Sequence, residues 1–187
     1  MVEKFVPTVG VFAGILNQDG GLLLRRRTLP EEEKSLISGK TIKRDWELPG
    51  GIAEQEEMLV ASNERGLISA LKREVREELG LEIDVSLPLQ TFPVVLAKEL
   101  APGKVANDIA MLIIVQPERW KGVPGGETMW VTPPVLEALA KKPAGEQLLS
   151  GWGKRMHRMS LIALSYSPNE DFRRQAQETL EKIYSAQ

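Results

Sequence analysis

The sequence predicts an α+β (mixed α/β) fold, a sandwich in which helices cover both faces of a mixed β-sheet. Short strand-like segments lie on both sides of one amphipathic helical segment at residues 66–79, and another helical segment closes the chain. Strands that are interrupted by one central helix and followed by others bury their apolar faces in layers. The 187 residues exceed the roughly 100–150 of a typical domain. We interpret residues 1–187 as one domain, with a core at about 6–140 and a helical extension at about 145–187.

The first elements are predicted strands. Residues 8–16 are apolar and rich in β-compatible side chains, and the turn-forming residues 17–21 separate them from three leucines at 22–24. This order predicts a β-hairpin. Residues 28–45 are polar and show no sustained period, which predicts a long loop.

A short extended segment with a sharp turn precedes the central helix. It begins at Trp46 and runs into Pro49, Gly50 and Gly51, where the backbone must turn. In the helical segment that follows, apolar residues recur at spacings of three and four, which describes one helix face. Gly80 is the residue type that ends a helix as a C-cap. The apolar face consists of Ile68, Leu71, Val75 and Leu79.

More strands and two helices are expected after the central helix. The predicted strands are residues 81–85, 90–100 and 108–116, with a turn at 101–104. The apolar run at 109–115 favours a central strand. Residues 130–131 predict a further short strand before a helix near Pro133, because proline is tolerated in a first turn. The last predicted helix, at about 171–184, has Phe172, Ala176, Leu180 and Ile183 on one side.

Composition excludes several classes of function. The 26 acidic and 24 basic residues give a net charge of -2, which offers no long-range attraction to a nucleic acid, so no nucleic-acid partner is expected. Cysteine is absent, which excludes disulfides, a thiolate nucleophile and cysteine-ligated metal centres. The single histidine, His157, cannot build a multi-histidine metal site, and we interpret it as a surface or packing residue.

The chain shows no sign of a membrane segment. Its amino terminus is apolar only over a strand-sized stretch, which is shorter than the apolar region of a signal peptide. No run approaches the roughly 20 apolar residues that a membrane-spanning helix requires. We therefore expect a cytoplasmic location and no membrane partner.

Three glutamates form the most informative pattern. Glu74, Glu77 and Glu78 are spaced i, i+3 and i+4, so on a helix they project from one stripe. Like charges at this spacing repel one another unless a cation lies among them. Magnesium binds carboxylate oxygens and bridges to phosphate oxygens, so the stripe fits such an ion. The alternative from spacing alone is a solvated acidic face, paired within the helix as in Arg73 with Glu77.

The residues around this stripe resemble the signature of the Nudix hydrolase family. The segments GGIAEQEE and REVREELGL resemble G-x5-E-x7-R-E-U-x-E-E-x-G-U, in which U is aliphatic. Fifteen residues separate Glu57 from Arg73 where the signature has seven, so the first glutamate of the signature is either Glu57 or Glu64. The matching residues are Gly51, Glu57, Arg73, Glu74, Val75, Glu77, Glu78, Gly80 and Leu81.

The resemblance implies a Nudix-type α/β/α sandwich and a role for several residues. Glu77 and Glu78 would bind Mg²⁺ (or Mn²⁺), with Glu74 as a third ligand or as the base that deprotonates the attacking water. The backbone carbonyl of Gly50 would add a ligand, and Arg73 would orient an acidic partner. Metal ions would lower the pKa of the bound water and neutralise a diphosphate.

Other residues are secondary candidates for the site. Arg26, at the end of a predicted strand, could reach a phosphate, although a solvated strand end is the ordinary alternative. Glu127 resembles a late acidic residue that some Nudix enzymes use as base or extra ligand. Trp46 and Trp130 could stack on a base, although a tryptophan in such a position is more often a core residue. The remaining candidates for binding metal or substrate are Glu47 and Asp108.

The resemblance implies hydrolysis of a nucleoside diphosphate linked to another group. The lead-in WELPGG favours a nucleotide sugar or ADP-ribose as the small-molecule substrate. Two alternatives stay open: release of pyrophosphate from a nucleoside triphosphate, and a nucleotide-binding Nudix domain without catalysis. Members of the family are often homodimers, so a homodimer is expected.

Overall fold

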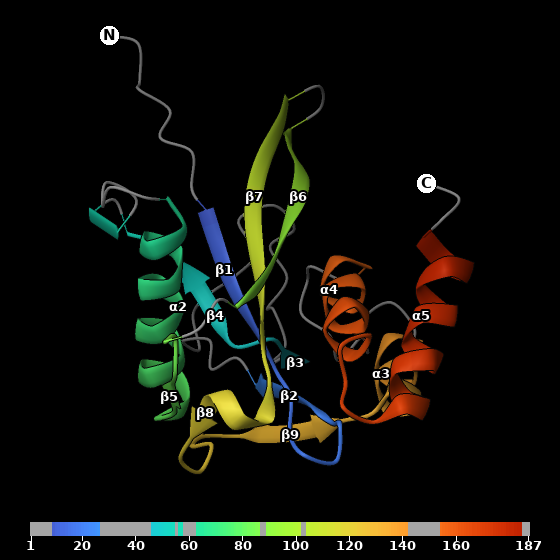
Figure 1. Ribbon diagram of the computed structural model, residues 1–187. Coiled ribbons are helices and arrows are strands. Elements are labelled where there is room, and N and C mark those ends of the chain that lie inside the picture. Colours follow the sequence, from blue (N-terminus) through green and yellow to red (C-terminus); the bar gives the residue numbers. More distant parts are fainter. Residues whose placement is uncertain are drawn as a thin grey trace, which may run out of the picture.

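The computed structural model describes residues 9–26, 46–54, 56–57, 63–86, 89–101, 104–141 and 154–184 (Figure 1). The loop predicted at 28–45 lies outside these residues, as do residues 102–103 of the predicted turn. The strands are β1 (Val9–Ile15), β2 (Leu22–Arg26), β3 (Trp46–Glu47), β4 (Gly50–Ile52), β5 (Glu82–Ile83), β6 (Gln90–Ala101), β7 (Lys104–Val115), β8 (Trp120–Lys121) and β9 (Thr128–Val131). The helices are α2 (Asn63–Leu79), α3 (Pro133–Ala140), α4 (Lys154–Leu164) and α5 (Glu170–Tyr184), with a 3₁₀ turn at Pro117–Arg119.

The main sheet is mixed, as predicted. Its strand order is β4-β1-β7-β6, in which β1 and β7 are parallel and the other neighbours are antiparallel. The apolar strand β7 lies between β1 and β6, which confirms that it is a central strand. A second sheet has the order β3-β2-β9, and β5 pairs with β8.

The predicted hairpin between the first two strands is wrong beyond its turn. The turn is present, since the backbone N–H of Gly20 donates to the carbonyl of Asn17 at 3.0 Å. Beyond one bridge between Leu16 and Leu22, however, β1 pairs with β4 and β7 whereas β2 pairs with β3 and β9. The turn residues predict only that the chain reverses direction, and not that the two flanking strands pair with each other. Residues 109–115 of β7 pair with the whole of β1 and thereby take the place expected for β2.

Alternation along the strands divides the core between two faces. Successive side chains of a strand point to opposite faces. Val11, Ala13 and Ile15 of β1 pack on the face that α2 covers, whereas Phe12 belongs to the cluster on the other face. Figure 1 shows α2 on one side of the sheet and α3, α4 and α5 on the other. The predicted α/β/α sandwich is confirmed.

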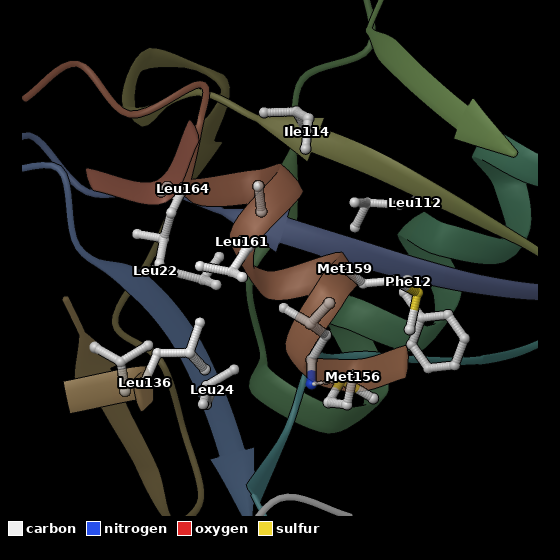
Figure 2. Close-up of a cluster of buried hydrophobic side chains, with 14 of the residues drawn as sticks. Phe12, Leu22, Leu24, Leu112, Ile114, Leu136, Met156, Met159, Leu161 and Leu164 are labelled. Carbon is white, nitrogen blue, oxygen red and sulfur yellow. Dashed lines mark hydrogen bonds between the residues drawn. The ribbon is translucent and has the colours of Figure 1, made fainter. Parts of the chain in front are cut away.

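Helix α4 is the element that the sequence specified least. Only the range of the extension, about 145–187, included it. It packs closely on β1, because a Cβ at Gly14 would lie 2.7 Å from the Cβ of Ala163. Figure 2 shows its apolar side chains among those of β1, β2, β7 and α3. From residue 156 onward, the buried side chains of α4 are Met156, His157, Met159, Ser160, Leu161, Ala163 and Leu164.

The last helix packs on the body of the chain, where Ala176 is fully buried against the cluster that α4 completes. His157 is a packing residue: its ring nitrogens contact Glu137 of α3 at 2.6 Å and the Tyr184 hydroxyl of α5 at 2.9 Å. Among the described helices, none has the length and apolar content that crossing a membrane needs.

Candidate active site

Two glycines let strand β4 lie close to its neighbours, Gly50 against β1 and Gly51 against helix α2. Gly50 has a φ of 150°, and a Cβ there would overlap the backbone of Val11. A Cβ at Gly51 would overlap the carboxylate of Glu74. The backbone N–H of Gly50 donates a hydrogen bond to Oε2 of Glu78 at 2.9 Å. The turn therefore holds two of the three stripe glutamates against the sheet.

Arg73 connects the start of the signature to the helix. Its Nε lies 3.1 Å from Oε1 of Glu57 and its Nη2 lies 3.0 Å from Oε2, so the two groups form a bidentate pair. Its Nη1 donates to Oε1 of Glu74 at 2.8 Å, and Nη2 donates to the carbonyl of Ile52 at 3.2 Å. The hydrogen bonds that Arg73 donates to Glu57 lower the pKa of Glu57 and raise the pKa of Arg73. Both groups therefore stay charged.

Arg25 of β2 reaches the same side of the sheet and contacts two acids. Arg25 and Glu47 are opposite one another in the β2–β3 pairing, and Nη2 of Arg25 lies 2.7 Å from Oε1 of Glu47. The same Nη2 also forms an ion pair with Oε1 of Glu78. The three side chains are between 8% and 17% exposed, so this cluster is largely withdrawn from water.

The sequence reasoning missed Arg25 and selected its neighbour Arg26. Strand alternation could have found it, because Arg25 shares the face of Leu23, which packs against α2. Arg26 has the parity of Leu22 and Leu24, which face the other helices. The alternation of side chains along the strand, with its period of two, thus distinguishes Arg25 from Arg26, whereas the residue type does not.

The pKa of Glu78 is raised to about 7, and burial of its carboxylate is the largest cause. The charges of Glu74 and Glu47 contribute to the rise, while Arg25 and the Gly50 N–H oppose it without overcoming the burial. A carboxylate in this situation is stabilised by additional positive charge.

The three stripe glutamates are not equivalent. Glu74 and Glu78 are 14% and 16% exposed, whereas Glu77 is 60% exposed and reaches Arg73 only at 3.5 Å. The helix spacing places the three glutamates on one stripe of α2, but strand β4 covers one edge of this stripe. The structure therefore places Glu78 within the electrostatic influence of both Glu74 and Glu47, and leaves Glu77 at the solvent side.

The remaining sequence candidates lie around this centre. Arg26 pairs with Glu127 at 2.5 Å, and both side chains are partly exposed. Trp46 is opposite Arg26 in the β2–β3 pairing and packs on the core. Trp130 is 36% exposed and stacks on Trp120, with ring centroids 5.8 Å apart. The side chain of Asp108 lies outside the described residues.

Gly80 closes the helix that carries the acids. Its φ is 67°, in the left-handed region, and its N–H donates to the carbonyl of Arg76 at 2.9 Å. This is the C-cap that the sequence predicted.

The donor set fits a hard divalent cation by its chemistry. Mg²⁺ and Mn²⁺ prefer oxygen ligands, and the carboxylates of Glu47, Glu74 and Glu78 supply them beside the main chain of Gly50. As the side chains stand, arginines pair with each of these acids. Over the residues that the structure describes, no three acidic or histidine side chains are gathered closely enough to hold an ion. The arginines thus act as the counter-ions of these carboxylates.

Comparison with known proteins places the chain in a family. A sequence model described as a NUDIX domain matches residues 4–147. No match was found among curated proteins.

Solved structures support the fold. They include Tm1382, a protein described as a Nudix hydrolase (15% identity, 85% of this chain and 71% of that chain, TM-score 0.53). They also include a MutT NUDIX hydrolase from Burkholderia pseudomallei (24% identity, 86% of this chain and 98% of that chain, TM-score 0.48). A third is the ORF135 protein of E. coli (22% identity, 88% and 94%, TM-score 0.48). Of these three, the likeness to Tm1382 carries the fold assignment.

Proposed function

Because the chain belongs to the Nudix hydrolase family and acts on phosphoanhydride bonds, we propose that it cleaves a nucleoside diphosphate linked to another group, with Mg²⁺ or Mn²⁺ as cofactor. Members of this family hydrolyse diphosphate derivatives of nucleosides and generally use a divalent metal. The narrower substrate that we propose is a nucleotide sugar or ADP-ribose. The basis for this narrower proposal is the lead-in WELPGG of the sequence.

One observation carries the proposal: the two parts of the signature meet in space despite the insertion between them. Glu57 forms a bidentate pair with Arg73, and Arg73 in turn holds Glu74. On the other side of the helix stripe, Gly50 donates to Glu78. We infer that Glu57, and not Glu64, fills the first acidic position of the signature. Arg73 is then a positioning residue that acts through Glu74.

We assign the helix glutamates to the cation and the water. Glu78 and Glu77 would be ligands, with the carbonyl of Gly50, and Glu74 would be a third ligand or the base that takes the proton of the attacking water. A bound divalent ion lowers the pKa of that water and neutralises the diphosphate. Glu74 is held by Arg73 at 2.8 Å and sits against Gly51, so its carboxylate has a fixed position.

Substrate contacts are proposed where β2 pairs with β3, at two partly buried residues. Arg26 and Trp46 are cross-strand neighbours, so a guanidinium for phosphate and an aromatic ring for a base stand side by side. Glu127 pairs with Arg26 and is more than half exposed, which supports a role at the entrance as a base or extra ligand. Glu47 contacts Arg25, so we place it with the acids around Glu78 and not with the substrate contacts.

The test is a screen with Mg²⁺ over nucleotide sugars, ADP-ribose, dinucleotides and nucleoside triphosphates, with the products identified. Two monophosphates from a linked diphosphate support the proposal. Pyrophosphate released from a triphosphate would replace the proposed substrate class, and binding without turnover would contradict catalysis. Glu77→Gln and Glu78→Gln should each lower the rate more than about tenfold. Glu82→Gln, at an exposed position of β5, is the matched control and should retain the rate.

The expected homodimer and cytoplasmic location stay predictions. Light scattering of the purified chain at several concentrations tests the first, because a homodimer has twice the mass of the 20.8 kDa chain. A single monomeric mass throughout would contradict it.

A further inference from the structure

Arg25 is the only described cation that contacts Glu78. Its guanidinium bridges Oε1 of Glu47, at 2.7 Å, and Oε1 of Glu78. A planar guanidinium can serve two carboxylates at once, which makes it a suitable substitute for a metal ion that would also bridge acids. The bridge joins β2 and β3 to α2, so it also ties the second sheet to the helix.

The hydrogen bonding of the Arg25 guanidinium and its charge balance with these acids are incomplete. Its Nε is buried and has no hydrogen-bond partner among the described residues. A buried donor without a partner is destabilising relative to one that is paired. One guanidinium also faces two carboxylates, so a single positive charge does not balance the pair. A divalent ion would supply more positive charge to the same oxygens.

The guanidinium and a divalent ion cannot occupy the same place. Both would contact Oε1 of Glu78, and two like charges in a site withdrawn from water repel strongly. Glu78 is only 16% exposed and its Oε2 already accepts the Gly50 N–H, so its carboxylate has little freedom to turn to a second cation elsewhere. Binding of a metal ion at Glu78 therefore requires Arg25 to withdraw.

We propose that Arg25 is an internal counter-ion that occupies the cation site of the metal-free enzyme and competes with the divalent ion for Glu78. This inference rests on the proposed function, since it presumes that Glu78 binds the catalytic metal. In the metal-free state Arg25 joins Glu47 to Glu78 and stabilises the fold. In the metal-bound state Arg25 leaves Glu78 and the ion takes its place.

The experiment measures Mn²⁺ affinity by electron paramagnetic resonance, without substrate, for the wild type and Arg25→Gln. Removal of the competitor should tighten Mn²⁺ binding at least about fivefold. Arg76→Gln is the matched control, because it removes the same charge from the opposite face of α2, where Arg76 lines a hollow with Lys72 and Ile83. It should change the affinity less than about twofold. Unchanged or weaker binding by Arg25→Gln would overturn the inference.

A second readout follows the stability of the fold. In EDTA, Arg25→Gln should melt at a lower temperature than the wild type, and saturating Mn²⁺ should raise its melting temperature by a larger increment. If Arg25→Gln does not fold, Arg25→Lys keeps the charge but ends one bond short of the position of Nη2, so it should hold the two acids less well and bind Mn²⁺ at least about twofold tighter than the wild type. Equal or weaker binding by that variant also overturns the inference.

The wild type can report the movement directly. With ¹⁵N-labelled arginine, the Nε–H signal that is lost in Arg25→Gln should shift as Mg²⁺ is added, and the shift should saturate with the bound metal. A signal that stays in place while Mg²⁺ binds would contradict withdrawal. If neither the wild type nor Arg25→Gln binds Mn²⁺ and no diphosphate is cleaved, the proposed function itself fails. Metal binding and turnover without competition from Arg25 would defeat this inference alone.

Discussion

At Glu78, burial and charge act in opposite directions on one carboxylate. Burial is the largest cause of its raised pKa, and the nearby carboxylates of Glu74 and Glu47 add to it. The Arg25 guanidinium and the Gly50 N–H stabilise the charged form but do not reverse the shift. In the metal-free protein, the ionised carboxylate of Glu78 therefore destabilises the folded state at neutral pH.

This balance predicts how the stability of the metal-free protein depends on pH. The folded state binds more protons than the unfolded state between the ordinary pKa of 4.5 and the raised value of about 7, so stability falls as pH rises through this window. The loss is on the order of 3 kcal/mol. Urea unfolding in EDTA at several pH values should show it, and Glu78→Gln should flatten the curve. Equal slopes in the two proteins would refute the assignment to Glu78.

Gly51 sets the position of Glu74 by having no side chain. A Cβ there would overlap the Glu74 carboxylate, so Gly51→Ala should push that carboxylate out of place. We expect a loss of turnover of more than about tenfold with a folded protein, because a displaced ligand or base misplaces the reacting water. Gly21→Ala, where the nearest atoms lie at 3.4 Å, is the control and should retain activity. The comparison needs turnover and circular dichroism of both variants, and similar rates would count against a fixed Glu74.

Among the elements, the pair of Glu57 with Arg73 joins the segment between β4 and α2 to the second half of the helix. Glu57→Gln removes a charge-assisted bidentate pair and should destabilise the fold by about 1–3 kcal/mol. It should also lower turnover, because Arg73 would no longer hold Glu74 as rigidly.

Glu64→Gln tests the alternative that Glu64, and not Glu57, fills the first acidic position of the signature. It should leave both stability and turnover near the wild type, because Glu57 already serves Arg73. Denaturant unfolding and turnover of the two variants decide between the residues. A larger effect from Glu64→Gln would transfer the signature position to Glu64.

At the scale of the whole molecule, α4 supplies the second covering layer of the sheet. Leu161 is fully buried in the cluster that Figure 2 shows, so Leu161→Ala should destabilise the protein by about 2–5 kcal/mol. Ile183→Ala, at a residue 40% exposed on α5, should cost much less. We also expect a single cooperative unfolding transition, since β1 and β7 supply side chains to both hydrophobic clusters. Calorimetry that resolves two transitions would show that the helical extension unfolds separately.

Local periodicity by itself determined the elements and the pattern of the stripe. Spacings of three and four fixed α2 and put its glutamates on one stripe, and Gly80 marked its end, because these features depend on neighbours within one turn. The apolar run of β7 predicted a central strand for the same kind of local reason.

Only the tertiary structure decided which partners these elements take. The turn after β1 predicted a hairpin, yet β7 pairs with β1, because backbone hydrogen bonding accepts any apolar strand that the fold brings alongside. Likewise, the helix spacing could not say that β4 would bury Glu74 and Glu78 while Glu77 faces solvent, or that Arg25 would reach Glu78. Burial and charge pairing depend on residues that are far apart in the chain. The spacing of side chains along a helix depends only on residues within the helix itself.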